Sequence, residues 1–462
     1  MVPALAPGRA AASGFLFTPF GGDDGQPAIG SAYSVYFNPA AIGDTQGTQL
    51  AVDGVFAYRY ARYDRPASSL SPSPGKSAAD PKYIDANTGV ATASGVQAAP
   101  YLGITTDFGK ALPIFLGFAS YVPEGGMSSF GKIGRFQNDP QAAGAYDGVQ
   151  RWALVSGSQV SWWNTLAVGT TIRPIRLSIG ASVSLVRDTM TSLIARNRDA
   201  SDNLTTSTGV PTEGRSLLDV AGTHLAVGAG IYWRTEDSAL RLGLSYMSAQ
   251  GLGESRLKGT LDTQFGAGAA ETQGADMLQH FPDVVRLGAA YRALPKLDLR
   301  VDGELVRWSN FEHQCIVLSG SACNLAPDGA EIVPQGGSTQ ILLNLSRKWQ
   351  DAYGLRFVAA WLPDDATEVT AGLGFDTSAI PSQQLDATYF DAFKLLGSLG
   401  VRRRIGARFF AGATLTQMNY MRVDNTANAT SYTNAIPSRS PSNGGIYNSS
   451  ITFLDVSIGA KL

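Results

Sequence analysis

Leu297-Asp298-Leu299-Arg300-Val301-Asp302-Gly303-Glu304-Leu305 alternates an apolar or small residue with a charged one at every step. Successive side chains of an extended strand point to opposite faces, so this stretch predicts a β-strand with one apolar and one charged face. The same period of two runs through 177–185 and 240–246. Each stretch is close to the ~9–11 residues that a tilted strand needs to cross the hydrocarbon core of a membrane. The repetition favours an antiparallel β-barrel in a membrane.

Composition excludes several other classes of protein. Charged residues make up 16% of the 462 residues and the formal net charge is −2, so nothing suggests a nucleic-acid partner. The longest apolar candidate, 111–122, is interrupted by Pro113, Gly117 and Ser120. A transmembrane helix needs about 18 or more consecutive apolar residues, so we exclude helical membrane spans.

The joints between the predicted strands fall into two alternating classes. We expect about 14 strands, an even number as in bacterial barrels. Short joints are predicted at 109–112, 174–176, 235–238, 294–296, 363–367 and 405–406. Long joints are predicted at 64–95, 124–164, 189–218, 265–282, 312–350, 378–393 and 423–449. Outer-membrane barrels have short periplasmic turns and long external loops, which gives the chain its orientation. The alternative is a soluble all-β sandwich or propeller, in which loop length has no reason to alternate by side.

Residues 1–47 do not share this alternation, because glycines, prolines and the pair Asp23-Asp24 interrupt any long strand. Barrels of 16–18 strands leave a water channel, so a wall of about 14 strands encloses a space that something must occupy. We therefore expect two domains: a hatch, or plug, at 1–47 inside the lumen, and a transmembrane barrel at 48–462.

The two cysteines, Cys315 and Cys323, lie close together in a predicted external loop. In an oxidising compartment they are expected to form a disulfide. A metal site is the weaker alternative, since His313 is the one further ligand nearby and no fourth is present. No cofactor is expected. Residues 1–12 lack the apolar core of an export signal, so such a signal is expected to be missing from this sequence or the start codon to be misassigned.

The predicted hatch carries the strongest resemblance to a known family. The stretch Gly30-Ser31-Ala32-Tyr33-Ser34-Val35-Tyr36-Phe37-Asn38-Pro39-Ala40-Ala41 resembles the hatch of the FadL/TodX family of outer-membrane transporters for hydrophobic compounds, above all in Asn38-Pro39-Ala40. Further matches follow in the family's order: Phe281-Pro282-Asp283 before a strand, Trp308-Ser309-Asn310-Phe311 after one, Trp349-Gln350-Asp351 before the next, and Asp376-Thr377-Ser378-Ala379-Ile380-Pro381 in a loop.

The resemblance implies a function. It implies uptake of long-chain fatty acids or aromatic hydrocarbons across the outer membrane of a Gram-negative bacterium. The ligand would be captured among the long loops, held in an apolar pocket and released sideways through the wall. The expected partners are the hydrophobic ligand and the surrounding lipid and lipopolysaccharide, with the barrel as a monomer. A general diffusion porin and a structural or adhesive surface barrel are the alternatives.

Candidate ligand contacts fall into three groups. In the hatch, Phe15, Phe17, Phe20, Tyr33, Tyr36 and Phe37 would line an inner pocket or form the plug's own core. In the loops, the candidates are Met127, Phe130, Ile133, Phe136, Phe265, Met277, Leu278 and Phe281, with loop-to-loop packing as the alternative. For a carboxylate ligand, strand parity points Arg241, Arg286, Arg300 and Arg356 into the lumen.

These arginines do not have the same expected role. Asp298 and Asp302 share the face of Arg300, so we expect Arg300 to belong to a charge ladder that joins wall and hatch. Arg286 and Arg356 have fewer acidic neighbours and are the better candidates for binding a carboxylate. Pro39 fixes its own backbone and restricts Asn38, so this pair predicts a rigid corner or a moving gate whose amide hydrogen-bonds the wall.

No enzymatic motif accompanies these features. The chain has no Gly-x-Ser-x-Gly elbow, no His-Glu-x-x-His and no glycine-rich phosphate loop. A dyad built on His224 is the remaining catalytic possibility, because catalytic partners need not be close in sequence. We predict a protein that is not an enzyme.

Overall fold

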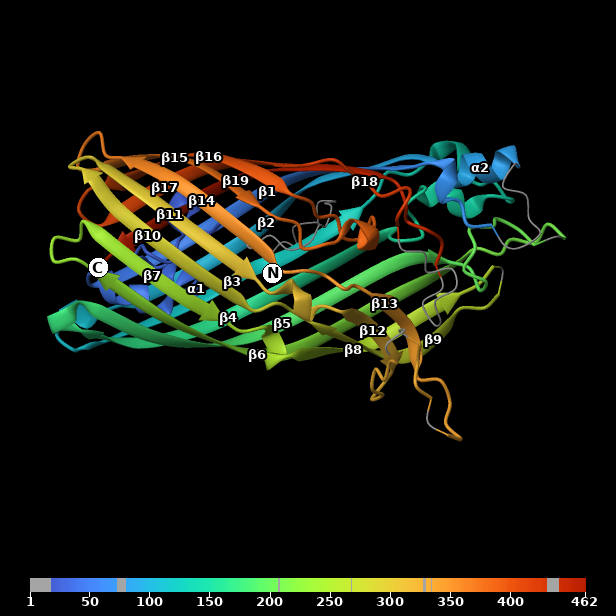
Figure 1. The fold of residues 1–462 in the computed structure, drawn as a ribbon, viewed down its shortest axis with the longest axis horizontal. Helices are drawn as coiled ribbons and strands as arrows, with labels where there is room; N and C mark the ends of the chain where they lie inside the picture. Colours follow the sequence, from blue (N-terminus) through green and yellow to red (C-terminus); the bar gives the residue numbers. More distant parts are fainter. Residues whose placement is uncertain are drawn as a thin grey trace, which may run out of the picture.

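A computed structural model describes residues 18–72, 80–206, 208–266, 268–326, 330–333, 335–429 and 440–462. Its strands form one antiparallel sheet that closes on itself, because the first strand pairs with the last. Counted as continuous pathways around the wall of the described chain, the strands number 14, as the sequence predicts. Figure 1 shows the resulting barrel with its tilted strands.

Six long strands form the first part of the wall: β1 (Thr48–Arg65), β2 (Gly89–Thr106), β3 (Ile114–Ser129), β4 (Ser156–Ile172), β5 (Leu177–Arg196) and β6 (Gly214–Arg234). The last part consists of β15 (Thr367–Asp376), β16 (Lys394–Ile405), β17 (Phe409–Tyr420), its short continuation β18 (Val423–Asp424) and β19 (Ile446–Lys461).

The four pathways between these parts are each broken in two. They are β7 (Leu240–Met247) with β8 (Glu254–Gln264), β10 (Val284–Leu294) with β9 (Glu271–His280), β11 (Leu297–Val306) with β12 (His313–Leu318), and β14 (Ala352–Trp361) with β13 (Ile341–Ser346). Each half pairs with the matching half of its neighbour. The predicted long joints at 265–282 and 312–350 are therefore wrong in part, since they contain β9, β12 and β13.

The helices are short. The α-helices are α1 (Ser34–Phe37) and α2 (Pro81–Asn87). The 3-10 turns are η1 (Gly22–Asp24), η2 (Pro39–Asp44), η3 (Ala67–Ser69), η4 (Phe108–Lys110), η5 (Gly134–Phe136), η6 (Ala143–Asp147), η7 (Arg173–Ile175), η8 (Gln250–Leu252), η9 (Trp308–Asn310) and η10 (Ser382–Gln384). Of these turns, η8 and η9 lie at the breaks between β7 and β8 and between β11 and β12. None of the helices in the described ranges is both long and apolar enough to cross a membrane.

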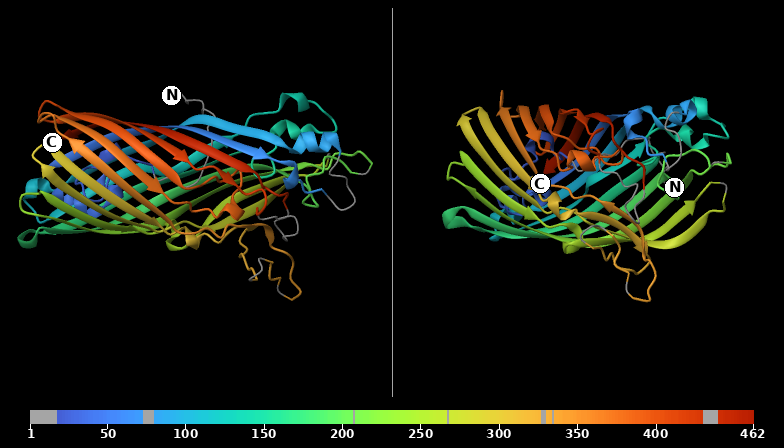
Figure 2. Two further views of the ribbon diagram at one scale, coloured as in Figure 1. Left: turned by 45° about the horizontal axis from the view of Figure 1, so that its top comes forward. Right: turned by 45° about the vertical axis from the view of Figure 1, so that its right-hand side comes forward.

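The two ends of the barrel differ as the loop lengths predict. One end, on the left in Figure 1, carries the short turns and the C-terminus, and the long connections with α2 lie at the other. The left view in Figure 2 shows the same separation. We call these the short-turn end and the long-loop end.

The alternation of residues matches the two faces of the wall. On β11, Leu299 is 46% exposed on the outer face, whereas Arg300 is 6% exposed on the inner face. Ile179 on β5 and Leu244 on β7 repeat the outward pattern, each 45% exposed. An apolar outer face with polar groups inside is what a barrel in lipid requires.

Candidate functional site

The N-terminal segment, residues 18–47, crosses the lumen at the short-turn end. Its η2 contacts the inner face of β3, β4, β5 and β6, while η1 contacts β15, β16 and β17 on the other side. A segment that contacts strands on opposite sides of a barrel obstructs the path between them.

Asn38 holds this segment to the wall. It is fully buried, and its Nδ2 donates to the carbonyls of Pro27 at 2.9 Å and Ile231 at 3.1 Å. Its Oδ1 accepts from the backbone N–H of Ala40 at 3.0 Å, which makes Asn38 the N-cap of η2 with Pro39 as the first residue of that turn. One amide therefore both starts the turn and anchors it to β6, the wall contact that the sequence predicts for it.

Four glycines on neighbouring strands make room for this corner: Gly180 on β5, Gly230 on β6, Gly243 on β7 and Gly288 on β10. A Cβ at Gly230 would lie 2.0 Å from Oδ1 of Asn38, and one at Gly243 would lie 2.0 Å from the carbonyl oxygen of Pro27. These glycines are needed because the segment's backbone lies directly against the sheet.

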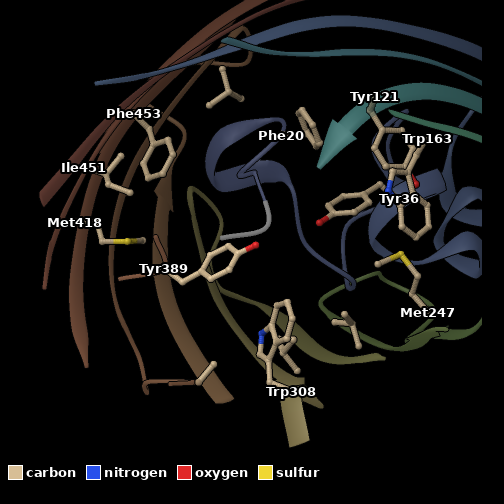
Figure 3. Packing of buried hydrophobic residues seen from close by; sticks show 14 of the residues in the cluster. Phe20, Tyr36, Tyr121, Trp163, Met247, Trp308, Tyr389, Met418, Ile451 and Phe453 are labelled. Atoms are coloured by element: carbon tan, nitrogen blue, oxygen red, sulfur yellow. The ribbon is translucent and has the colours of Figure 1, made fainter. Parts of the chain in front are cut away.

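The segment's aromatic side chains pack with aromatic residues of the wall. The ring of Phe20 lies 5.6 Å from that of Tyr36, 5.1 Å from Tyr101 and 5.9 Å from Tyr121. In Figure 3, Phe20, Tyr36, Tyr121 and Trp163 gather on one side of the lumen, and Tyr389, Ile451 and Phe453 lie opposite them. Phe20, Tyr36 and Phe37 are buried in this core and do not line the large cavity described below. Phe15 and Phe17 lie outside the described residues.

Arg300 belongs to a charge ladder that joins the wall to the N-terminal segment, as predicted, but its partners are not the Asp298 and Asp302 on which the prediction rested. Its guanidinium pairs with Asp24 of the segment and with Glu368 of β15, both at 2.8 Å. Arg402 on β16 pairs with the other oxygen of Asp24 at 2.6 Å. Arg241, also predicted to face inward, pairs with Asp298 at 2.6 Å.

Arg286 and Arg356 lie close to the N-terminal segment. Arg286 pairs with Glu304 at 2.9 Å, donates to the hydroxyl of Tyr36 at 3.1 Å and lies 4.6 Å from the centre of that ring. Arg356 lines a small cavity of about 40 Å³ beside Asp302 and the segment's η1. The structure therefore does not bring these two arginines to the large cavity.

The large cavity has a volume of about 620 Å³ and lies between the N-terminal segment and the long-loop end. Most of its lining is apolar, and it includes Val55, Ala57, Ala99, Met127, Leu154, Ile451 and Phe453. Residues of the outer face also line it, among them Phe56 (45% exposed), Val96 (54%) and Trp162 (42%). A cavity lined by both faces of the wall passes through the wall.

The passage lies where β2 and β3 separate. They pair from Thr106↔Leu116 to Tyr101↔Tyr121, and the next backbone hydrogen bond to β2 comes from Gly131, two residues beyond the end of β3, to Thr92 at 3.0 Å. We call the interval between these two points the wall opening. Within it, the amide of Gln97 donates to the carbonyl of Met127 at 3.3 Å.

A β-bulge in β3 accounts for the separation. From Tyr121↔Trp163 to Glu124↔Ser161, β3 advances three residues while β4 advances two. Such an extra residue bends a strand away from its neighbour. Pro123 lies in the bulge and Pro100 faces it from β2, and neither can donate a ladder hydrogen bond.

A family model described as "Outer membrane protein transport protein (OMPP1/FadL/TodX)" matches residues 174–405, half of the chain. The chain belongs to this family. Members of the OMPP1/FadL/TodX family are transport proteins of the outer membrane and not enzymes, so the chain is an outer-membrane transport protein of Gram-negative type.

Solved structures of the same fold include family members by name. A FadL homologue from Pseudomonas aeruginosa has a TM-score of 0.73 at 13% identity, over 99% of each chain. The toluene transporter TodX from P. putida has a TM-score of 0.63 at 14% identity, over 97% of this chain and 98% of its own. The toluene transporter TbuX from Ralstonia pickettii has a TM-score of 0.60 at 13% identity, over 96% and 98%. No curated protein sequence matches the chain.

The loop candidates of this OMPP1/FadL/TodX member are placed in different surroundings. Met127 lines the large cavity, and Phe130 lines a smaller cavity next to it. Phe136 packs with Ala86, Ala142 and Ala145 within the loops, with Ile133 against them. Met277 and Leu278 are buried in β9, Phe281 is buried at the break between β9 and β10, and Phe265 lies under Arg198. The sulfurs of Cys315 and Cys323 are joined in a disulfide.

His224 does not form a catalytic dyad. Its Nδ1 lies 2.9 Å from Asp188 and its Nε2 lies 3.3 Å from the carbonyl of Arg256. Ser161 donates its hydroxyl hydrogen to the other oxygen of Asp188 at 2.6 Å, and so it is bonded to the carboxylate and not to the imidazole ring. Within the described ranges, no cluster of side chains suits a metal ion.

Proposed function

We propose that the protein takes up hydrophobic small molecules, which enter the large cavity from the long-loop end and leave through the wall opening into the membrane. The observation that carries the proposal is the cavity of about 620 Å³ with lining from both faces of the wall. This volume lies within the ~300–1,000 Å³ of typical small-molecule sites. The free energy of an apolar solute falls when it moves from water into such an apolar lining, and lipid offers it a similarly favourable environment.

The N-terminal segment supports a lateral route over an axial one. It obstructs the lumen at the short-turn end and is held there by Asn38, by the Arg300–Asp24 pair and by Arg286. We propose that residues 1–47 act as a hatch and that 48–462 form the barrel. With the axial path obstructed, the wall opening is the shorter way out of the cavity.

The substrate class follows the lining. Long-chain fatty acids and aromatic hydrocarbons both fit a mainly apolar cavity, and the structural relatives include toluene transporters. We propose that the protein works as a monomer surrounded by lipid and lipopolysaccharide. One chain closes the whole wall, and its outer face is apolar.

Deleting Pro123 tests the route. The deletion removes the extra residue of the bulge, so Val122 would pair with Trp162 while the pairing from Glu124↔Ser161 onward stays in register. We expect β3 to straighten toward β2 and uptake to fall by about tenfold or more. Deletion of Gly336 from an exposed connection is the matched control.

Uptake is measured as accumulation of radiolabelled dodecanoate and toluene by a Gram-negative host without its own channel of this kind. Outer-membrane abundance and heat-modifiable electrophoretic mobility verify folding. Full uptake by the folded Pro123 deletion would contradict the lateral route. Large steady ion currents from the intact protein in a planar bilayer would instead support a general porin.

A further inference from the structure

Arg59 is a buried cation in the wall of the large cavity. It lies on the inner face of β1 and is 3% exposed. On one side it pairs in register with Ile451 of β19, and on the other with Gly95 of β2. Gly95 has no side chain, so no side chain at this position separates Arg59 from the edge of β2 that borders the wall opening.

The guanidinium of Arg59 has no hydrogen-bond partner among the described residues. Its Nε, Nη1 and Nη2 are all buried and all unpaired. Three of the other inward arginines, Arg241, Arg286 and Arg300, each pair with a carboxylate. A buried charge without hydrogen bonds is strongly unfavourable, so this one calls for an anionic partner.

A second unpaired donor lies beside it. Arg59 lines both the large cavity and a smaller one of about 10 Å³, which Ser128 of β3 and Phe130 also line. The hydroxyl of Ser128 is buried without a partner. A volume of ~10–15 Å³ holds about one water-sized group, which suits one oxygen of a carboxylate.

Neighbouring charges leave the site positive. The carboxylate whose field reaches Arg59 is Asp391, and this carboxylate already pairs with Lys394 at 2.6 Å. Its other oxygen accepts from the N–H of Ala379 at 2.7 Å. At the bulge, Glu124 also lines the large cavity, but no ion pair joins it to Arg59 among the described residues. An anion is therefore favoured at Arg59.

We propose that Arg59, together with Ser128, binds the carboxylate of an amphipathic acid whose hydrocarbon chain lies in the large cavity. Arg59 would thereby select such acids over neutral hydrocarbons of the same length. The guanidinium donates in parallel to both carboxylate oxygens, the geometry that arginine favours. The inference rests on the proposed function, which requires only that the cavity takes up apolar molecules.

The test compares two ligands that differ only in their head group. The full chain in lipid nanodiscs is titrated with tritiated dodecanoate and tritiated dodecanol at pH 8, above the background of empty nanodiscs. Hydrogen bonds to a charged group are each worth ~1.5–3 kcal/mol, so we expect dodecanoate to bind about 10- to 100-fold more tightly.

The variants are Arg59→Leu, Arg59→Lys and Arg187→Leu. Arg59→Leu should lose the preference for dodecanoate and leave dodecanol binding unchanged. Arg59→Lys keeps the positive charge but loses the paired N–H donors of the guanidinium, so it should retain part of the preference for dodecanoate. Arg187 is exposed on the outer face of β5, so its loss should change neither affinity. Arg59→Leu removes an unpaired buried charge, so the barrel should remain folded, as heat-modifiable mobility will verify.

Equal affinity of the intact protein for both ligands would overturn the inference, as would an unchanged preference in Arg59→Leu. Either result would mean that water alone solvates Arg59, while the proposed uptake of apolar molecules would stand. Failure of the intact protein to bind either ligand would instead contradict the proposed function.

Discussion

Replacing Asn38 with alanine should release the N-terminal segment from the wall. The substitution removes three hydrogen bonds, at 2.9, 3.1 and 3.0 Å, from a fully buried side chain. Each leaves a buried backbone group without its partner, which costs about 1–3 kcal/mol. Three such losses sum to roughly 3–9 kcal/mol, or about 10²- to 10⁶-fold in the docking equilibrium.

The remaining contacts should keep most molecules docked. The Asp24 pairs with Arg300 and Arg402 persist, and so does the hydrogen bond from Ser245 to the carbonyl of Phe37 at 2.6 Å. The variant should therefore fold normally and show brief, more frequent releases of the segment. Gly230→Val should act similarly from the wall side, because its Cβ would lie 2.0 Å from Oδ1 of Asn38.

A single introduced thiol measures these releases. Ala40→Cys places a thiol at a fully buried position, and the two native cysteines are joined to each other. A membrane-impermeant maleimide should label this thiol about 10²- to 10⁶-fold faster in the Asn38→Ala background, if labelling follows the docking equilibrium. Asn448→Ala, at an exposed position on β19, is the control. Equal labelling rates with and without the amide of Asn38 would refute the reasoning.

Two further predictions concern the long-loop end. Serine at both Cys315 and Cys323 should destabilise the connection after β12 by about 2–4 kcal/mol, measured as faster proteolysis there; an unaltered cleavage rate would mean that the surrounding strands alone hold it. Burial by itself would raise the pKa of Asp147, but hydrogen bonds and ion pairs with Lys132 and Arg215 hold this pKa below its ordinary value of 3.8. A lowered pKa in the folded state contributes stability above the unfolded pKa and loses it as the pH falls through the folded one. Hydrogen exchange in η6 should therefore increase as the pH falls below about 3.8, and Asp147→Asn should remove that dependence.

The sequence allowed the wall to be predicted where one face of a strand meets lipid. Leu299 and Arg300 differ in hydropathy because they meet different solvents, so their alternation is visible without a structure. The strands that were missed lack this contrast. In β12, Gln314, Cys315, Ile316 and Val317 are all buried, so both faces of the strand meet protein and the period of two disappears.

The candidate site was less predictable because it depends on partners far apart in the chain. Arg59 follows Val55 and Ala57 on the inner face of β1, and its parity could have marked it as inward-facing. That it lacks a carboxylate partner depends on β3, β19 and the segment before β16, none of them near it in sequence. Arg286 shows the converse case. It has no acidic neighbour within β10, but Glu304 of the next strand pairs with it in the fold.

Several backbone hydrogen-bonding positions at the wall opening are accounted for, which indicates that the opening is a stable part of the barrel and not a local disruption of it. In a hydrocarbon environment each unpaired backbone group costs several kcal/mol, so a gap in the ladder is unstable unless its groups find other partners. Two prolines at the gap, Pro100 and Pro123, have no N–H to satisfy. The carbonyl of Pro123 accepts from the N–H of Thr18 at 3.0 Å, and that of Met127 accepts from the side chain of Gln97. Thr18 of the N-terminal segment thus satisfies the edge of the opening, so movement of this segment would expose that edge and change the opening's stability.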